Sequence, residues 1–248
     1  MAAGAAVTGA RHLRMARNGQ DAVATWVGDG AAAAVVCDGC GSGASSEVGA
    51  RLGAQLVIAA IAARLAGGAR AEAVWDGARD QVVAALARLA EAMAGDREAV
   101  IREHLLFTVV AAAVDRDAAC VWAVGDGAYQ LSPGALRVIG PFTDNQPPYL
   151  GYELLGMPPA AHVEVRDAGA GRLLVATDGI AELGADALDE LVAPRTLAHP
   201  DGLRRRLARH ARSDERIDWD ARRVVRTPAA LQDDGAIAVL GWAPGGWS

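Results

Sequence analysis

Short, almost continuous apolar runs dominate the hydrophobic pattern of this chain. Three of these runs end at an Asp-Gly pair: Asp38-Gly39, Asp126-Gly127 and Asp178-Gly179. A further acidic pair, Asp233-Asp234, comes just before an apolar run. Apolar runs of this length predict buried strands. Each of these carboxylates is therefore expected where a strand meets a loop, which is a common position for catalytic groups.

The first part of the chain predicts a hairpin followed by two helices. Residues 22–26 and 31–37 predict strands around Asp29-Gly30, because Asp-Gly between two apolar runs is a strong hairpin signal. Apolar positions recur at helical spacing over 46–65 and again over 73–93. We expect both helices to pack as a layer against strands.

From residue 105 onward the pattern changes to short strands with short connections, which predict antiparallel neighbours. The expected strands are 105–114, 118–124, 129–131, 136–139, 163–165, 173–176 and 237–242. Residues 140–161 contain five prolines and predict a long irregular segment. Loops of that length are often functional lids. A short helix is expected over 202–211.

This order of elements predicts an α+β fold in which helices cover antiparallel sheets. No Gly-x-Gly-x-x-Gly motif opens a helix within a strand-helix-strand unit, so a doubly wound nucleotide fold is not indicated. No repeat or shift in composition marks a boundary. We therefore expect one domain over residues 1–248.

Composition adds limits on chemistry and partners. The chain is 52% hydrophobic but only 4% aromatic, so its core is expected to consist mainly of Ala, Val and Leu. Its formal charge is −6, which disfavours an extended nucleic-acid interface. Every basic side chain apart from histidine is Arg, since the sequence contains no Lys. Schiff-base chemistry and a phosphate-loop lysine are thereby excluded.

The expected location is the cytoplasm. Residues 1–10 carry no basic residue ahead of an apolar block and make a poor secretory signal. Arg51 and Arg64 interrupt the longest apolar helix, so no membrane span is expected. Three cysteines in a chain of this length do not form a disulfide framework.

Cys37 and Cys40 have the Cys-x-x-Cys spacing of zinc and redox motifs. A closed zinc site would need two further soft ligands, and the sequence holds no second pair of this kind. Cys37 also belongs to an apolar run, where a buried and inert thiol is the simpler interpretation.

Carboxylates gathered from several strand ends suit a hard cation such as Mg²⁺ or Mn²⁺, which prefers oxygen ligands. The alternative for any single Asp-Gly pair is an ordinary turn, the interpretation we give to Asp29-Gly30. Together the pairs indicate a metal-dependent hydrolase. No Ser-His-Asp or Cys-x₅-Arg pattern stands out, so no protein nucleophile is expected.

Six motifs follow one another in a recognisable order. They are Gln20-Asp21-Ala22, Asp38-Gly39-Cys40-Gly41-Ser42, Phe107-Thr108, Gly125-Asp126-Gly127, Ala176-Thr177-Asp178-Gly179 and Asp233-Asp234. In this order the chain resembles the metal-dependent protein phosphatases of type 2C, and most of all their compact bacterial branch. The resemblance extends from about residue 9 to residue 240.

The resemblance implies a four-layer αββα sandwich, two antiparallel sheets flanked by helices, with a binuclear Mn²⁺ or Mg²⁺ centre at one end. Asp38 would bridge the two ions, the Gly39 carbonyl would bind one of them, and Asp178 would bind the other. Asp233 would bind the same ion as Asp178, and Asp234 is the second choice for that role. Asp21 would act through water, and Asp126 would share a looser third ion with Asp178. Paired divalent ions neutralise the phosphate and lower the pKa of a bridging water, which suits attack on a phosphate monoester.

Recognition of phosphate should need an arginine, because its planar fork can bind two oxygens. Arg17 is the favoured candidate and Arg14 the alternative, since both precede Asp21 closely. His12 is a candidate acid or phosphate contact, with an ordinary hydrogen-bonded histidine as the simpler interpretation.

One position departs from the family pattern. Many members have His directly after the Asp-Gly ligand pair, where it can protonate the leaving alkoxide, and this chain has Cys40. Two hypotheses follow: slower turnover of alkyl than of aryl phosphoesters, and control of activity by oxidation of the thiol.

The expected function is dephosphorylation of phosphoserine or phosphothreonine on proteins, with a Ser/Thr kinase as the antagonist. One alternative is a catalytically weak or inactive module that binds phosphoproteins as a regulator or scaffold, and another is a hydrolase of small phosphoesters. The arginine-rich residues 204–226 are expected to form a solvated helix and loop, or else a docking surface for an acidic or phosphorylated partner.

Overall fold

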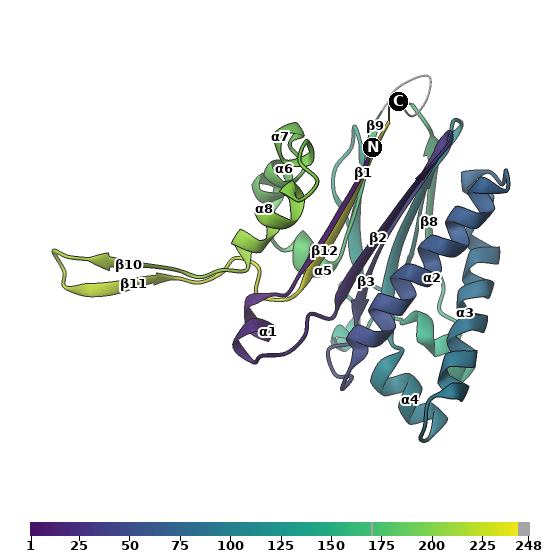
Figure 1. Ribbon diagram of the computed structural model, residues 1–248, viewed down its shortest axis with the longest axis horizontal. Helices are drawn as coiled ribbons and strands as arrows, with labels where there is room; N and C mark the ends of the chain where they lie inside the picture. The colour runs from purple at the N-terminus through teal and green to yellow at the C-terminus, as the bar shows by residue number, and fades with distance from the viewer. Residues whose placement is uncertain (170, 243–248) are drawn as a thin grey trace.

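Two five-stranded sheets face each other, and helices cover the outer face of each one (Figure 1). The computed structural model describes residues 1–169 and 171–242. Neighbouring strands within both sheets are antiparallel. The expected αββα sandwich is confirmed.

The first sheet has the order β2-β3-β4-β5-β8. Its strands are β2 (Asp21–Gly28), β3 (Ala31–Gly39), β4 (Phe107–Val114), β5 (Ala118–Val124) and β8 (His162–Asp167). Its outer layer consists of α2 (Ser46–Ala66), the 3₁₀ turn η1 (Ala71–Ala73), α3 (Trp75–Ala92) and α4 (Arg97–His104).

The second sheet has the order β1-β12-β9-β6-β7. Its strands are β1 (Ala2–Val7), β12 (Gly235–Trp242), β9 (Gly171–Ala176), β6 (Gly127–Ser132) and β7 (Arg137–Ile139). Its outer layer consists of α5 (Asp178–Ala181), α6 (Ala185–Leu191), α7 (Pro194–Leu197) and α8 (Gly202–His210). The short helix α1 (Ala10–Arg14) lies at the end of the sandwich opposite the N-terminus (Figure 1).

The central strands are apolar at every position because both of their faces are buried. Side chains still alternate between the faces. Val35 and Cys37 pack toward the helices, whereas Val36 packs between the two sheets with residues of β6, β9 and β12. Asp38 is two residues after Val36 and therefore points to the same face of the strand. Its carboxylate is directed into the space between the sheets at their open end.

Helix α2 has the length and apolar composition of a membrane span, with a mean hydropathy of 1.5. More than half of that stretch is buried inside the protein, 56% by residue. Its small residues contact the sheet, and the side chain of Phe107 fills the space above Gly53. This helix has the packing of a core helix in a globular fold.

The connection from β5 to β6 differs from the sequence expectation. We expected consecutive strands to be antiparallel neighbours, but β5 belongs to the first sheet and β6 to the second. Gly125 and Gly127 have φ of +90° and +138°, which L side chains rarely adopt. They allow the chain to cross between the sheets, and the crossing carries Asp126 to the open end of the sandwich.

The hydrophobic pattern missed several elements, among them β1, α1 and α4. Strand β1 consists of Ala, Gly and one Val, so it shows no apolar alternation. Helix α1 is only one turn long, and α4 is short and strongly charged. The strand predicted from residue 105 begins at Phe107, because Leu105 is the C-cap of α4.

The prediction of a solvated helix and loop over 204–226 was wrong for its second half. Helix α8 forms as expected, but β10 (Asp214–Asp218) and β11 (Arg223–Thr227) pair as a hairpin that projects from the body (Figure 1). Both faces are solvated, and Trp219 at its tip is 78% exposed. A hairpin without a buried face has no apolar periodicity to reveal it.

Candidate metal centre

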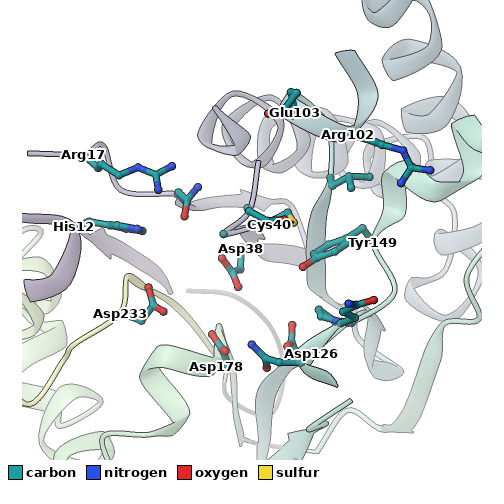
Figure 2. A pocket seen from close by; sticks show the side chains of 18 of the residues that line it. His12, Arg17, Asp38, Cys40, Arg102, Glu103, Asp126, Tyr149, Asp178 and Asp233 are labelled. Carbon is teal, nitrogen blue, oxygen red and sulfur yellow. Dashed lines mark hydrogen bonds between the residues drawn. The ribbon is translucent and has the colours of Figure 1, made fainter. Parts of the chain in front are cut away.

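A pocket of about 640 Å³ lies at the open end of the sandwich (Figure 2). It is lined by Asp38 and Gly39 at the end of β3, Asp126 at the sheet crossing, Asp178 after β9 and Asp233 before β12. Figure 2 shows the carboxylates of Asp38, Asp126, Asp178 and Asp233 directed toward one space. Four segments far apart in the sequence therefore bring their acidic groups together.

Asp38 lies in a row of polar residues across three strands of the first sheet. Its backbone pairs with Asp21 on β2 and with Thr108 on β4. Burial raises the pKa of Asp38 well above its usual range, and the charges of Asp21 and Asp178 raise it further. A bound cation would strongly stabilise the ionised form of a carboxylate in this setting.

Asp21 is 8% exposed and lies behind the pocket wall. Its Oδ2 accepts a hydrogen bond from the hydroxyl of Thr177, with 2.6 Å between the oxygens. Thr177 also pairs with Ala236 through the backbone of the second sheet, so it ties Asp21 across the sandwich. Burial raises the pKa of Asp21 to about 8, although the hydrogen bond from Thr177 lowers it. No individual role for Thr177 was predicted, because its importance depends on a contact between the two sheets.

Asp126 and Asp178 face each other from neighbouring turns. Burial raises the pKa of Asp126 to about 6, with a further contribution from the charge of Asp178. Burial also raises the pKa of Asp178, and the charge of Asp233 adds to the effect. The backbone N–H of Gly179 donates to Oδ1 of Asp178 at 2.7 Å and fixes that side chain at the start of α5.

Asp234 has a different setting from Asp233. Its side chain is 3% exposed, and its carboxylate is surrounded by protein donors. The backbone N–H of Gly9 donates to Oδ1 at 2.7 Å, and that of Gln20 donates to Oδ2 at 2.6 Å. Asp234 thus holds both ends of the segment that carries α1, while Asp233 lies at the pocket wall.

Close backbone packing makes this convergence possible. A Cβ added to Gly9 would lie 2.0 Å from the carbonyl oxygen of Asp233, and one added to Gly179 would lie 2.1 Å from that of Asp234. Only glycine allows three chain segments to approach so closely. The Asp-Gly pair at 178–179 is therefore more than a turn signal.

The two candidates for the phosphate-binding arginine, Arg17 and Arg14, have side chains in different places. Arg17 lines the pocket, and Figure 2 shows its side chain extended along the pocket wall. Arg14 instead donates from Nη2 to Oε1 of Gln232 at 3.3 Å. Ala16, between them, has φ of +52°, a left-handed conformation that costs an L residue about 1–2 kcal/mol. This reversal at the end of α1 brings Arg17 to the pocket.

Cys40 lies in the pocket wall beside Ser42 and Tyr149. Its Sγ is 3.1 Å from Oγ of Ser42. Burial raises the pKa of the Cys40 thiol, but hydrogen bonds from Ser42, Tyr149 and the backbone outweigh this effect and leave the pKa below its usual value. The thiol occupies the place that directly follows the Asp38-Gly39 pair.

The proline-rich segment 140–161 forms part of the pocket. It contains the 3₁₀ turns η2 (Thr143–Asn145) and η3 (Leu150–Leu155), and it contributes Gln146, Pro147, Tyr149 and Tyr152 to the lining. Arg102 and Glu103 of α4 also line the pocket. Sequence reasoning marked this segment as a functional loop but singled out none of these side chains, because no local pattern distinguishes them.

The donor set fits a hard divalent cation. Carboxylates predominate at the pocket, and those of Asp38, Asp126 and Asp178 all have raised pKa values through burial and mutual repulsion. Aspartate oxygens and a backbone carbonyl such as that of Gly39 are the ligands that Mg²⁺ and Mn²⁺ prefer. The geometry therefore defines a candidate metal centre at the end of an αββα sandwich.

Comparison with known proteins identifies the class. The sequence profile of the family described as Protein phosphatase 2C matches residues 8–216. No curated protein sequence matches the chain. Because the profile covers most of its length, the chain belongs to the protein phosphatase 2C family.

Solved structures agree with this fold. One similar structure is the serine/threonine phosphatase Stp1 from Staphylococcus aureus, with 16% identity, a TM-score of 0.60, and coverage of 97% of this chain and 94% of that one. The phosphatase PstP/Ppp from Mycobacterium tuberculosis has 18% identity, a TM-score of 0.59 and coverage of 98% of both chains. The catalytic domain of PstP in complex with two manganese ions has 19% identity, a TM-score of 0.58 and coverage of 96% of both chains. At these identities the likeness concerns the fold alone.

Proposed function

We propose that this chain is a Mn²⁺- or Mg²⁺-dependent protein phosphatase that hydrolyses phosphoserine and phosphothreonine. The convergence of Asp38, Asp126, Asp178 and Asp233 on one pocket is the observation that carries the proposal. Family membership supports a phosphatase, and the PstP structure with two manganese ions supports a divalent metal.

The proposed roles follow from where each donor lies. Asp38 and the Gly39 carbonyl would hold one ion, and Asp38, Asp178 and Asp233 would hold another. Asp126 with Asp178 would hold a third, looser ion, and Asp21 would orient Asp38 from behind. When bound, such ions supply charge neutralisation for the phosphate and a water of lowered pKa.

Metal titration of the EDTA-treated protein against two substrates tests the proposal. Metal-dependent release of phosphate from a phosphoserine peptide would support it. Hydrolysis of p-nitrophenyl phosphate without hydrolysis of any phosphopeptide would indicate a small-phosphoester hydrolase. Tight binding of phosphopeptides without turnover at saturating Mn²⁺ or Mg²⁺ would indicate a regulatory module, the alternative that Cys40 in place of His leaves open.

Arg17 is the proposed phosphate contact. Replacing Arg17 with alanine is expected to raise KM for a phosphoserine peptide by about 10- to 100-fold, since a charged hydrogen bond contributes about 1.5–3 kcal/mol. Arg14→Ala is the matched control, because Arg14 is bonded to Gln232. Steady-state kinetics of both variants would measure the difference, and equal KM values for the two would contradict the assignment.

Cys40 provides a test of leaving-group chemistry. We expect Cys40→His to raise turnover of a phosphoserine peptide about 10-fold or more, because imidazole can protonate an alkoxide near neutral pH. Turnover of p-nitrophenyl phosphate should change little, since its leaving group needs no acid. Cys40→Ser serves as the control of similar size. If the ratio of the two rates is the same in all three proteins, the acid role at position 40 is wrong.

We further propose that residues 1–248 act as one phosphatase domain in the cytoplasm, opposite a Ser/Thr kinase. The cysteines Cys37, Cys40 and Cys120 are all free and buried, which suits a reducing compartment. Labelling of thiols in cell fractions would test the location. The kinase would be sought as the source of phosphoproteins that accumulate when Asp178→Asn replaces the native protein.

A further inference from the structure

His12 is a buried imidazole at the pocket wall, and its two ring nitrogens have different surroundings. The residue is 6% exposed and belongs to α1. Its Nδ1 lies 2.7 Å from Oδ2 of Asp234. Within residues 1–169 and 171–242, Nε2 has no hydrogen-bond partner, and Figure 2 shows the ring directed into the pocket. The second nitrogen is therefore available to a ligand.

Asp234 fixes the tautomer of this ring. Both of its oxygens accept backbone N–H groups, from Gly9 at Oδ1 and from Gln20 at Oδ2. Because those backbone groups can only donate, the carboxylate acts as an acceptor toward its neighbours, and Nδ1 of His12 carries the proton. In the neutral ring Nε2 then presents its lone pair to the pocket.

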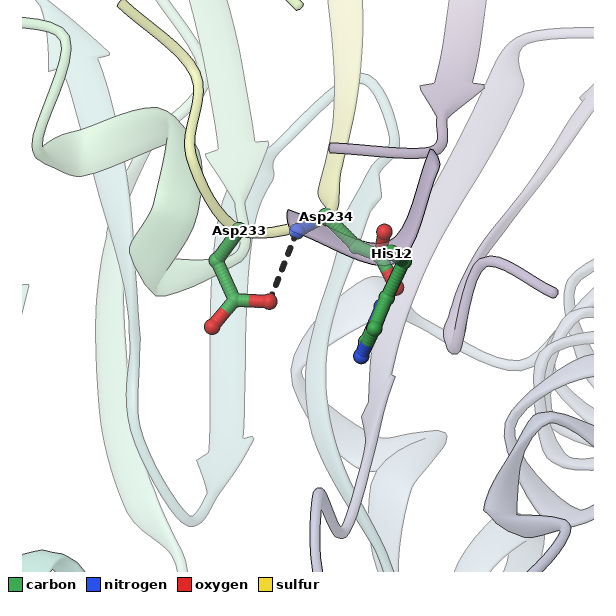
Figure 3. A group of neighbouring side chains, drawn as sticks. All are labelled: His12, Asp233 and Asp234. Atoms are coloured by element: carbon green, nitrogen blue, oxygen red, sulfur yellow. Dashed lines mark hydrogen bonds and ion pairs between the residues drawn. The ribbon is translucent and has the colours of Figure 1, made fainter. Parts of the chain in front are cut away.

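Asp233 lies close to this imidazole and lines the same pocket. His12, Asp233 and Asp234 each offer a ligand atom, and these atoms lie within 4.8 Å of one another (Figure 3). Oδ1 of Asp233 accepts the N–H of Asp234 at 2.9 Å, which holds the carboxylate at the pocket wall. A histidine whose other nitrogen donates to a carboxylate is the usual arrangement of a metal-bound imidazole.

We propose that Nε2 of His12 and the carboxylate of Asp233 are ligands of the same divalent ion, with Asp234 as the residue that orients the imidazole. The centre would then contain one nitrogen ligand among its oxygen donors. A nitrogen ligand favours first-row transition ions over Mg²⁺, which binds oxygen almost exclusively. The centre should therefore discriminate in favour of Mn²⁺. This inference rests on the metal centre of the proposed function but not on turnover.

Pulsed electron paramagnetic resonance of bound Mn²⁺ tests the proposal directly, because a coordinated imidazole gives ¹⁴N modulation that oxygen ligands do not. The full-length protein is treated with EDTA, desalted and loaded with Mn²⁺. We expect ¹⁴N modulation in the native protein, its replacement by a ¹⁵N pattern after labelling with ¹⁵N-histidine, and its loss in His12→Gln. His199→Gln is the matched control, since His199 is exposed and outside the pocket.

Binding measurements give a second readout. His12→Gln is expected to weaken Mn²⁺ binding by at least about 10-fold and to change Mg²⁺ binding by less than about threefold. Asp234→Asn should weaken Mn²⁺ binding while the nitrogen signal remains. Circular dichroism would confirm that the variants fold, and the labelled native protein needs no substitution.

Bound Mn²⁺ without nitrogen modulation in the native protein would overturn the proposal, and so would modulation that persists in His12→Gln. Phosphatase activity together with either of these results would leave the proposed function intact. Nitrogen modulation in a protein that hydrolyses no phosphoester would support the ligand and refute the function.

Discussion

Replacing Asp38 with asparagine is expected to lower turnover of a phosphoserine peptide at least about a thousandfold, which corresponds to about 4 kcal/mol of transition-state stabilisation. Asp38 lies between Asp21 and Thr108 in the first sheet and faces Asp178 across the pocket. Loss of its charge removes the group proposed to hold both ions together. Initial rates at saturating Mn²⁺ would measure the effect.

Asp29→Asn is the matched control for this substitution. Asp29 also precedes a glycine, but it is exposed in the turn between β2 and β3. Its replacement should leave turnover within about twofold of the native rate, as expected for a surface position. In EDTA, Asp38→Asn should be at least as stable as the native protein, because burial raises the pKa of Asp38 and opposes its ionisation. Turnover within tenfold of the native rate would refute the proposed role of Asp38.

Removal of metal should make the stability of the native protein strongly dependent on pH. In EDTA, the Tm is expected to fall as the pH rises from 5 to 8, and added Mn²⁺ should raise the Tm more at pH 8 than at pH 5. Burial raises the pKa of Asp21 to about 8 and that of Asp126 to about 6, from an ordinary value of 3.8. Scanning calorimetry with and without Mn²⁺ would measure both effects.

The sign follows from proton linkage. Where the folded pKa exceeds the unfolded pKa, the folded state binds more protons, so stability falls as the pH rises through the interval between them. For Asp21 the interval runs from 3.8 to about 8. Asp21→Asn should flatten the pH dependence in EDTA, and comparison with the native protein cancels the contribution of the histidines. A Tm difference between the two proteins that does not change with pH would contradict the assignment.

Strand positions were predictable where a strand has two buried faces. The runs that became β3, β4 and β5 are apolar throughout, and α2 and α3 show helical spacing, so local pattern was sufficient. The hairpin of β10 and β11 was not predictable, because neither of its faces is buried. Strand β1 was missed for a related reason: small side chains pack well between neighbours but carry little hydrophobic signal.

The acidic residues of the pocket were visible in the sequence as a set, but their individual settings were not. Asp126 reaches the pocket because the chain crosses between sheets at that turn. Asp233 and Asp234 are neighbours in sequence, yet one lines the pocket and the other is enclosed by backbone donors. Their roles as ligands remain predictions that the spectroscopy and kinetics above can test.

The sequence by itself determined the class of fold, the strand ends that carry carboxylates, and the oxygen-rich chemistry of the centre, because these depend on residue type and local periodicity. The tertiary structure alone decided that Thr177 supports Asp21, that Arg17 rather than Arg14 lines the pocket, and that His12 presents Nε2 there. Such contacts join residues more than a hundred positions apart, and their distances are set by the packing of two sheets. No local pattern encodes that packing.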